Sequence, residues 1–555
     1  MKKSRTLWRR IGAFTVIAII GLAIMACGTA TSADDPRVYH TITFITNGGS
    51  AIAPVRVPNG QPLTRPTTPT RSGHNFAGWH SDAELTTPFG FATPITGPTT
   101  LYARWFVFVS DQFTALTGWE MMGRLGMGIN IGNAMEASGD WFTGCPITEM
   151  EIIWGAARIE QWHFAAIAAK GFNTVRLPVN WGPRMDDNWN IDGAWMNRVQ
   201  EVVDWALAED LYVIINTHHV AVLYALLNER RLDEAENWLR AVWGQIADRF
   251  KYYPERLIFE PMNEPRPGID GWYWDPVAHR DRIHSLALAT NRLNHAALDF
   301  IRGSGGHNAQ RIVKLVTVQA DANIIYTYEH PADDPYVMLG TFFYPGREEN
   351  QLEQISAALN KGIPIVIKET SPLHDPNAPM TTAEMLAWSR RVYEGLASLG
   401  VPSIWWNTGG YGPDQLLCRA TGRWVNIPQL EIFFAAYGAR LGPGMTPPPL
   451  FPFELASAVE GTGFNNWNFP TIIKDLAEAM VVEFEGTIDS GFMFARWTAE
   501  DGWMEYSSGH GRITIEPGRL ILDIRGLSGN NVHFALWGEN DVHKVTRIYL
   551  TGPNP

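Results

Sequence analysis

Cysteine is scarce in this chain, since its 555 residues include only three, Cys27, Cys145 and Cys418. A secreted scaffold that relies on disulfides needs a larger and even set of cysteines. Cys145 and Cys418 could pair with each other or stay free, and the sequence leaves both states open. No group of His and Cys residues has the spacing of a metal site. We therefore expect no disulfide framework, no metal and no organic cofactor.

Positive charge is also in short supply. The chain has 44 Lys and Arg residues against 57 Asp and Glu, which gives a net charge of -13. Proteins that bind nucleic acid need a basic surface, so we expect no nucleic-acid partner. The acidic balance is compatible with an exported protein that acts on a neutral substrate.

A confident membrane-spanning run is missing as well. The one long apolar stretch, "IGAFTVIAIIGLAIMAC", is short for a span and follows the basic segment "MKKSRTLWRR". It ends in Ile24-Met25-Ala26-Cys27, which resembles a bacterial lipobox, and this resemblance implies that Cys27 becomes lipidated in the mature chain. Ordinary signal cleavage and a retained membrane anchor are the alternatives. We expect export to the cell surface, with the N-terminal lipid as the only contact with the membrane.

Tryptophan, by contrast, is abundant, with 23 residues. Its flat face stacks well on sugar rings, although packing in large cores explains part of this number. Hydrophobic residues make up 45% of the chain and charged residues 18%, as in a globular protein of several domains.

The N-terminal part of the chain has three sections. Residues 1–27 form the signal, and residues 28–39 form a polar tether. Residues 40–106 contain short β runs separated by turn signals such as Asn47-Gly48-Gly49. With "FAGW" and "LYARW", this section resembles one copy of the β-rich repeat of internalin-type bacterial surface proteins. The resemblance implies a spacer or adhesive unit without chemistry of its own.

Residues 111–441 alternate between short apolar runs and amphipathic segments of helical period. Eight buried strands, each followed by a connection long enough for a helix, predict a (β/α)8 TIM barrel, an α/β fold. The expected strands are "GMGINIG", "NTVRLPV", "LYVIINT", "LIFEPMNE", "RIVKLVTV", "YVMLGTFF", "IPIVIKE" and "VPSIWW".

The C-terminal part begins with a Pro-rich linker at residues 442–453. Residues 454–555 alternate with the period of β-strands and predict a β-sandwich. Such a sandwich on a carbohydrate-active chain is most often a carbohydrate-binding module. Trp497, Trp503 and Trp537 are either its binding platform or part of its core.

Polar residues cluster where the expected barrel strands end, and in this fold the chemistry collects at the C-terminal ends of the strands. The fourth strand ends in Asn263 and Glu264, and the seventh ends in Glu369. Further polar and aromatic residues lie in or just after the other strands: Asn130, Asn133, Arg176, Trp181, His218, His219, Trp405, Trp406 and Asn407. Two carboxylates on opposite sides of one barrel mouth are difficult to explain as surface charge.

Paired carboxylates are what glycoside hydrolysis requires. One donates a proton to the leaving oxygen, and the other attacks the anomeric carbon when the pair is close, so that configuration is retained. Arg176 would keep the attacking carboxylate ionised, and Trp406 would form a floor for the sugar. Glu260, four residues before Glu264, is expected to support the site from inside the barrel.

Five segments in order resemble glycoside hydrolase family 5, most of all its endo-β-1,4-glucanase and xyloglucanase branch: "MGINIGNAMEA", "AIAAKGFNTVRLPVNW", "IDGAWMNRVQEVVDWALAEDLYVIINTHH", "LIFEPMNEPR" and "VPSIWWNTGG". The resemblance covers about residues 111–440. It implies Glu264 as acid/base, Glu369 as nucleophile, and Asn263 as the partner of the sugar 2-hydroxyl. Arg176 would support Glu369.

The same resemblance implies further roles around the sugar. His218 would be a subsite histidine with His219 beside it, and Trp406 would stack on the sugar at the cleavage subsite. Asn130 and Asn133 would be structural or contact an outer subsite. Trp272 and Trp274 would either line the leaving-group side or pack within their loop.

The chain departs from the family pattern at two strands. The sixth strand reads Thr341-Phe342-Phe343-Tyr344-Pro345, so the usual His is absent, and Tyr344 can serve as the usual Tyr only if the register slips by one. In the seventh strand Lys368, in place of the usual Gly, precedes Glu369. Successive side chains of a strand alternate faces, so we expect Lys368 to point away from Glu369.

These observations predict a retaining endo-glycosidase that cleaves β-1,4-linked glucans such as cellulose, mixed-linkage glucan or xyloglucan. We expect it to act as a monomer. One alternative is an impaired barrel that captures surface polysaccharide without cutting it, which the missing His would explain. A second alternative is an endo-β-mannanase.

Overall fold

A computed structural model describes residues 38–442 with gaps, and after them the strands of residues 453–551. The gaps before residue 442 are 73, 92, 107–112, 138–146, 220–222, 224–230, 266–279, 318–327, 332, 344–347, 373–379 and 411–414. Cys27, Cys145, Trp272, Trp274, Tyr344 and Trp537 therefore lie outside the described residues. No helix of the described part is long and apolar enough to cross a membrane.

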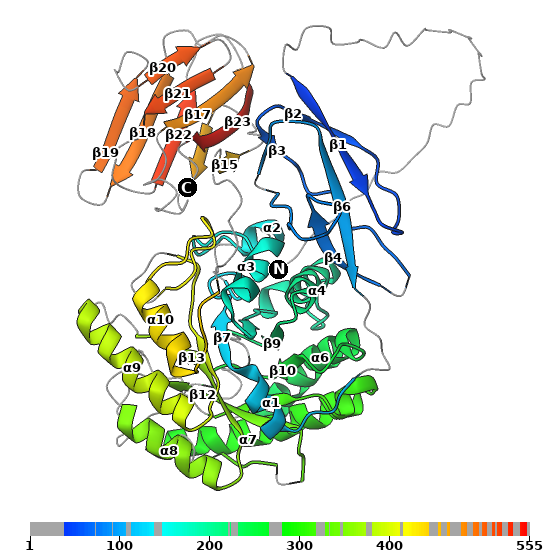
Figure 1. Ribbon diagram of the computed structural model, residues 1–555, viewed down its shortest axis with the longest axis vertical. Helices are drawn as coiled ribbons and strands as arrows, with labels where there is room; N and C mark the ends of the chain where they lie inside the picture. The colour runs from blue at the N-terminus through cyan, green and yellow to red at the C-terminus, as the bar shows by residue number, and fades with distance from the viewer. Residues whose placement is uncertain are drawn as a thin grey trace, which may run out of the picture. The chain divides into compact units, whose positions relative to one another are not determined.

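Eight parallel strands close into a barrel in the order β10-β11-β12-β13-β14-β7-β8-β9, which confirms the predicted fold (Figure 1). The strands are β7 (Met127–Asn130), β8 (Thr174–Leu177), β9 (Tyr212–Asn216), β10 (Leu257–Glu260), β11 (Val313–Val316), β12 (Val337–Phe343), β13 (Ile365–Thr370) and β14 (Ser403–Trp405). Since all eight are parallel, their carboxyl ends meet at one rim, where side chains distant in sequence come together.

Helices follow the strands around the barrel (Figure 1). They are α1 (Gly118–Leu125), α2 (Ile147–Met150), α3 (Gln161–Lys170), α4 (Gly193–Ala208), α6 (Leu232–Phe250), α7 (Arg280–Gly303), α8 (Glu348–Asn360), α9 (Thr382–Ser398) and α10 (Ile427–Ala436), with 3-10 turns at Gly182–Arg184 and Gly306–Ala309. Capping boxes fix two of the starts, Thr117 with Glu120 for α1 and Thr381 with Glu384 for α9.

Many tryptophans are structural. Among the residues whose burial the structure describes, eight tryptophans are fully buried: Trp79, Trp181, Trp195, Trp205, Trp238, Trp243, Trp388 and Trp405. Packing in cores therefore accounts for at least these eight, and Trp405 at the end of β14 belongs to this set. Its ring packs on Tyr393 at a centroid distance of 5.4 Å.

The repeat section has its own small core. Its sheet has the order β2-β1-β6-β4, formed by β1 (Tyr39–Ile45), β2 (Val55–Pro58), β4 (Asn75–His80) and β6 (Thr99–Phe106), with a short pair β3 (Gln61–Pro62) and β5 (Pro94–Ile95). "FAGW" and "LYARW" lie on the antiparallel neighbours β4 and β6. Trp79 and Leu101 from these two strands are buried, so the signature residues build the core.

The C-terminal strands form two antiparallel sheets, as the predicted sandwich requires. The first sheet has the order β15-β23-β17-β21-β20, from β15 (Phe453–Ala456), β17 (Ala479–Glu485), β20 (Ile513–Glu516), β21 (Arg519–Asp523) and β23 (Lys544–Thr551). The second has the order β16-β22-β18-β19, from β16 (Gly463–Asn466), β18 (Phe492–Thr498), β19 (Gly502–Ser507) and β22 (Asn531–Leu536). Trp497 and Trp503 are paired across β18 and β19.

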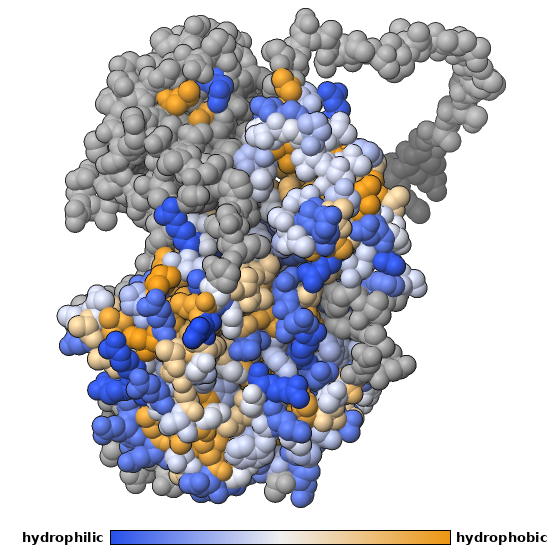
Figure 2. Space-filling view, in the orientation of Figure 1, coloured by the Kyte–Doolittle hydropathy of each residue, from blue (hydrophilic) through white to orange (hydrophobic). Residues whose placement is uncertain are grey.

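Hydrophobic residues on the viewed barrel surface are interspersed with hydrophilic ones (Figure 2). Large exposed apolar side chains of the described barrel residues are spread over several segments, with Trp119 on α1, Leu288 on α7 and Ile427 on α10, while Ile152 and Trp154 share one turn. Apolar side chains scattered singly in this way are ordinary for a protein surface.

Candidate active site

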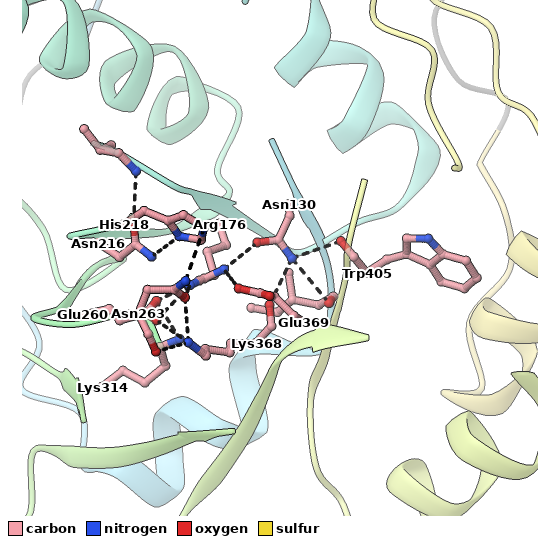
Figure 3. A network of polar contacts seen from close by, with 12 residues as sticks. Asn130, Arg176, Asn216, His218, Glu260, Asn263, Lys314, Lys368, Glu369 and Trp405 are labelled. Carbon is pink, nitrogen blue, oxygen red and sulfur yellow. Dashed lines mark hydrogen bonds and ion pairs between the residues drawn. The ribbon is translucent and has the colours of Figure 1, made fainter. Parts of the chain in front are cut away.

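The polar residues predicted at the strand ends gather around Arg176 of β8 (Figure 3). All five of its N–H groups have a partner. Nε and Nη2 donate to the two oxygens of Glu260 at 2.7 and 2.9 Å. Nη1 donates to Glu369 Oε1 at 2.6 Å and Asn130 Oδ1 at 3.0 Å, and Nη2 also donates to Asn263 Oδ1 at 2.7 Å. Because a guanidinium has five N–H donors, Arg176 is saturated and its position is fixed.

Glu260 is the anionic centre beneath the site. It is fully buried on β10 and contacts Arg176 on one side and Lys314 of β11 on the other, where Nζ lies 2.6 Å from Oε2. Burial opposes its ionisation, but Arg176, Lys314 and Lys368 outweigh burial and hold the pKa of Glu260 well below its usual range. The predicted support from inside the barrel is therefore an ionised carboxylate.

Glu369 is the more accessible carboxylate, with a side chain 15% exposed at the end of β13. Burial raises its pKa above the ordinary value, and the nearby charge of Glu264 adds to the increase. Arg176 and Lys368 act in the opposite direction. Glu369 is thus a partly exposed carboxylate, and the guanidinium of Arg176 holds it in place.

Asn263 and Glu264 follow β10 at the barrel mouth, and both are buried, with exposures of 1% and 6%. The structure brings this pair together with Glu369 through Arg176, which bonds both Glu369 and Asn263. The amide nitrogen of Asn263 lies 3.3 Å from His218 Nε2.

The two histidines that follow β9 adopt different environments. His218 is buried, and its ring is nearly parallel to that of Trp406, with centroids 6.0 Å apart and an interplanar angle of 8°. His219 lies edge-on to His218 at 4.3 Å and also contacts Trp154, at 5.5 Å. Trp154 is 37% exposed, and no sequence motif had singled it out.

Two asparagines of the first strand and its loop have structural contacts. Asn130 donates to the backbone oxygens of Lys368 at 3.0 Å and Trp405 at 3.1 Å, which ties β7 to β13 and β14. Asn133 has a positive φ of 55°, and its backbone N–H donates to the buried carboxylate of Glu136. Burial raises the pKa of Glu136 to about 7.

The expectation for Lys368 was wrong. Its side chain is fully buried inside the barrel and contacts Glu260 and Asn263, instead of pointing away from the site. The pairing of β12 with β13 passes from Thr341–Ile367 directly to Phe342–Glu369, so Lys368 is the extra residue of a β-bulge. A bulge suspends the alternation of faces on which the prediction relied.

The sequence reasoning missed Lys314, and it did not assign Lys368 to the site. Each is a lysine within an otherwise apolar strand, in "VKLV" and "IVIKET". Lysine is almost never fully buried unless it is paired, so a lysine inside a buried strand is itself a signal of an anionic partner. At the sixth strand, Thr341 and Phe343 are buried, and no described residue of β12 is a histidine.

Comparisons with known proteins agree with this geometry. Residues 135–412 match the model of the cellulase family (glycosyl hydrolase family 5), and residues 40–104 match the Listeria-Bacteroides repeat domain, which confirms the predicted repeat. The chain is 29% identical over 334 residues to endoglucanase A of Ruminococcus albus, covering 56% of this chain and 88% of that protein. It is 36% identical over 342 residues to endoglucanase B of Paenibacillus lautus, covering 56% of this chain and 57% of that protein.

Solved structures give the same result. A GH5-4 broad specificity endoglucanase from Ruminococcus champanellensis with bound cellotriose superposes with a TM-score of 0.53 at 26% identity, covering 58% of this chain and 99% of that one. The GH5-4 broad specificity endoglucanase from Clostridium longisporum gives a TM-score of 0.52 at 26% identity, covering 59% and 99%.

Proposed function

The chain belongs to the cellulase family, glycosyl hydrolase family 5, and from this premise we propose that it is a retaining endo-β-1,4-glucanase with Glu264 and Glu369 as its catalytic pair. The observation that carries the assignment is the bonding of Arg176, which holds Glu369 and the neighbour of Glu264 at one barrel mouth.

In the first step, Glu369 attacks the anomeric carbon while Glu264 donates its proton to the leaving oxygen. A covalent glycosyl-enzyme forms and the shortened glucan departs. Arg176 stabilises the ionised form of Glu369, and Asn263 bonds the sugar 2-hydroxyl. The ring of Trp406 supports the sugar, with His218 beside it.

In the second step, Glu264 acts as a base and removes a proton from water, which attacks the anomeric carbon and releases Glu369. Two inversions at the same carbon retain its configuration. No metal or cofactor takes part in either step.

The substrate is a β-1,4-linked glucan, and we propose that it is accepted as cellulose, mixed-linkage glucan or xyloglucan. Support comes from the two structural neighbours described as broad specificity endoglucanases, one of them with bound cellotriose. We further propose that the enzyme works as a monomer at the cell surface, held by a lipid on Cys27.

The test measures hydrolysis of soluble cellulose, mixed-linkage glucan, xyloglucan and β-mannan by the full chain. Both Glu264→Gln and Glu369→Gln should lose polysaccharide hydrolysis, the first by about 100- to 10,000-fold because it removes general acid–base catalysis. An aryl β-cellobioside with a good leaving group separates the roles. Glu264→Gln should still form the glycosyl-enzyme from this substrate, and Glu369→Gln should not.

Two outcomes would contradict the proposal. Glucan binding without release of reducing ends would indicate a polysaccharide-capture protein. Product with inverted configuration would exclude Glu369 as the nucleophile.

A further inference from the structure

Lys368 is a buried cation that the mechanism so far does not use. Its Nζ lies beside the carboxyl end of β10, where three oxygens of Glu260 and Asn263 surround it (Figure 3). They are the backbone oxygen of Asn263, Asn263 Oδ1 at 2.7 Å and Glu260 Oε1 at 3.4 Å. An ammonium group has three N–H donors, so these acceptors match the protonated form of Lys368. The ring of Phe342, 4.0 Å from Nζ, adds a favourable cation–π contact.

The Asn263 amide is held between two cations. Its Oδ1 accepts from Arg176 Nη2 and from Lys368 Nζ, each at 2.7 Å. The oxygen and nitrogen of an amide have almost the same shape, so packing alone does not determine which of them faces the cations. Without Lys368, only the charge of Arg176 would keep the oxygen on this side. With Lys368 present, an amide flip would place an NH2 group against two cations. The Asn263 nitrogen is therefore directed to the other side, toward His218.

The His218 ring is itself held in place by Asn216. The backbone N–H of Val179 donates to Asn216 Oδ1 at 3.0 Å, so the amide nitrogen of Asn216 donates to His218 Nδ1, also at 3.0 Å. Asn263 Nδ2 lies 3.3 Å from His218 Nε2, so the nitrogen side of the amide faces the His218 ring. A hydroxyl oxygen of the substrate is a suitable acceptor for the Asn263 N–H groups.

We propose that Lys368 is a positioning residue for the glycosidase reaction, which fixes the Asn263 amide as a donor to the sugar 2-hydroxyl. This inference rests on the proposed function and deepens it. Hydrogen bonds from charged donors are stronger than neutral ones, and linked hydrogen bonds polarise one another. The hydrogen bonds from Lys368 and Arg176 to Oδ1 therefore make the N–H groups on the opposite side of the amide stronger hydrogen-bond donors. Lys368 also bonds the backbone oxygen of Asn263 and so orients the peptide that leads to Glu264.

Lys314 provides a matched control. It is a second fully buried lysine and contacts Glu260 Oε2 at 2.6 Å, but no contact between Lys314 and Asn263 is found among the described residues. Replacing either lysine removes one buried charge next to Glu260. Only the replacement of Lys368 should disturb the Asn263 amide.

The experiment compares Lys368→Met, Lys368→Gln and Lys314→Met with the wild-type chain on an aryl β-cellobioside and on its analogue without the 2-hydroxyl at the cleaved sugar. Thermal unfolding reports the folding of each variant. Lys368→Met should lower kcat/KM on the hydroxyl substrate by up to about 100-fold, as misplacement of a substrate-positioning group does. On the deoxy analogue the loss should be much smaller, because the bond in question is already absent.

The controls should behave differently. Lys368→Gln keeps a neutral N–H donor near Asn263 Oδ1, so its loss on the hydroxyl substrate should be intermediate, and it replaces Lys368→Met if that variant does not fold. Lys314→Met should affect both substrates by the same factor. Equal losses of a folded Lys368 variant on the two substrates, or full activity on the hydroxyl substrate, would overturn the inference alone. A wild-type chain inactive on both substrates would overturn the proposed function and the inference with it.

Discussion

Arg176 connects the two proposed catalytic carboxylates, one directly and the other through its neighbour in the chain. It bonds Glu369 directly, and it reaches Glu264 through the preceding residue, Asn263. Its bidentate contact with Glu260 uses two further donors. Lysine could not replace it, because an ammonium offers three donors and would leave buried acceptors without partners.

The charge of Glu264 should be visible in the pH dependence of Glu369. Burial and the Glu264 carboxylate both raise the pKa of Glu369, so removal of the charge in Glu264→Gln lowers it. Glu264 carries charge during the titration of Glu369 because the two carboxyls share a proton as a coupled pair. Attack requires ionised Glu369, so removing this sharing should move the acid limb of the pH profile to lower pH in the variant. The measurement is the rate at which a fluoro-sugar inactivates the enzyme, followed against pH. Its leaving group departs without acid catalysis, so the rate depends on attack by Glu369. Glu394→Gln on α9, an exposed carboxylate, is the matched control, and an unmoved limb in Glu264→Gln would contradict this coupling.

The sequence singled out Glu264 and Glu369 because each lies at or just after the end of an apolar strand, and their catalytic roles stay predictions. It was also sufficient to predict the Arg176 contact with Glu369. The positions of Lys314 and Lys368 could not be predicted in the same way. A lysine in a strand is ordinarily assigned to the solvent face, and its partner Glu260 is distant in sequence.

At the scale of the element, the bulge in β13 determines which of its side chains point into the site. Without the extra residue, Lys368 and Glu369 would point to opposite faces. With it, Lys368 contacts Glu260 while Glu369 contacts Arg176. The pairing of β13 with β14 is also irregular between Ile367 and Thr370, so both neighbours accommodate the same distortion. Such a bulge depends on tertiary contacts, and sequence alternation alone does not reveal it.

The segments that follow β7 and β14 approach each other closely, which gives a prediction at this scale. A Cβ on Gly132 would lie 3.1 Å from Cζ2 and 3.2 Å from Cη2 of Trp406, and 3.1 Å from the backbone oxygen of Asn407. Gly132→Ala should displace the Trp406 ring and weaken its stacking by about 0.5–1.5 kcal/mol, which raises KM for cello-oligosaccharides by up to about tenfold.

Gly123→Ala on α1 is the control for this change, because nothing lies within 4 Å of the added Cβ. It should leave KM unchanged and stabilise the helix by about 0.5–1 kcal/mol. Kinetics on cello-oligosaccharides and thermal unfolding of both variants provide the comparison. An unchanged KM in Gly132→Ala would show that the sugar does not depend on the position of Trp406.

At the scale of the whole molecule, the repeating pattern of strand and helix predicted the barrel, because eight successive strand–helix units are typical of this one fold. The repeat was recognisable because "FAGW" and "LYARW" form its core strands, β4 and β6. In the C-terminal sheets the alternation predicted strands, but it carries no information on whether Trp497 and Trp503 bind sugar. A tryptophan that packs in a core and one that stacks on a ligand can both fit the alternation of a strand, so the pattern does not distinguish them.

Removal of the C-terminal sheets should separate catalysis from attachment to the substrate. The described site residues lie between Asn130 and Asn407, the barrel closes through the pairing of β14 with β7, and Gly442 still bonds the backbone oxygen of Lys170. A chain that ends at Gly442 should therefore keep its kcat/KM on soluble mixed-linkage glucan. If the sheets are a carbohydrate-binding module, the shortened chain should bind insoluble cellulose with lower affinity than the full chain. Binding is measured with the Glu369→Gln substitution in both the shortened and the full chain, so that no cleavage occurs. Unchanged affinity would contradict the module assignment, and lost activity in a folded short chain would mean that the C-terminal sheets complete the active site.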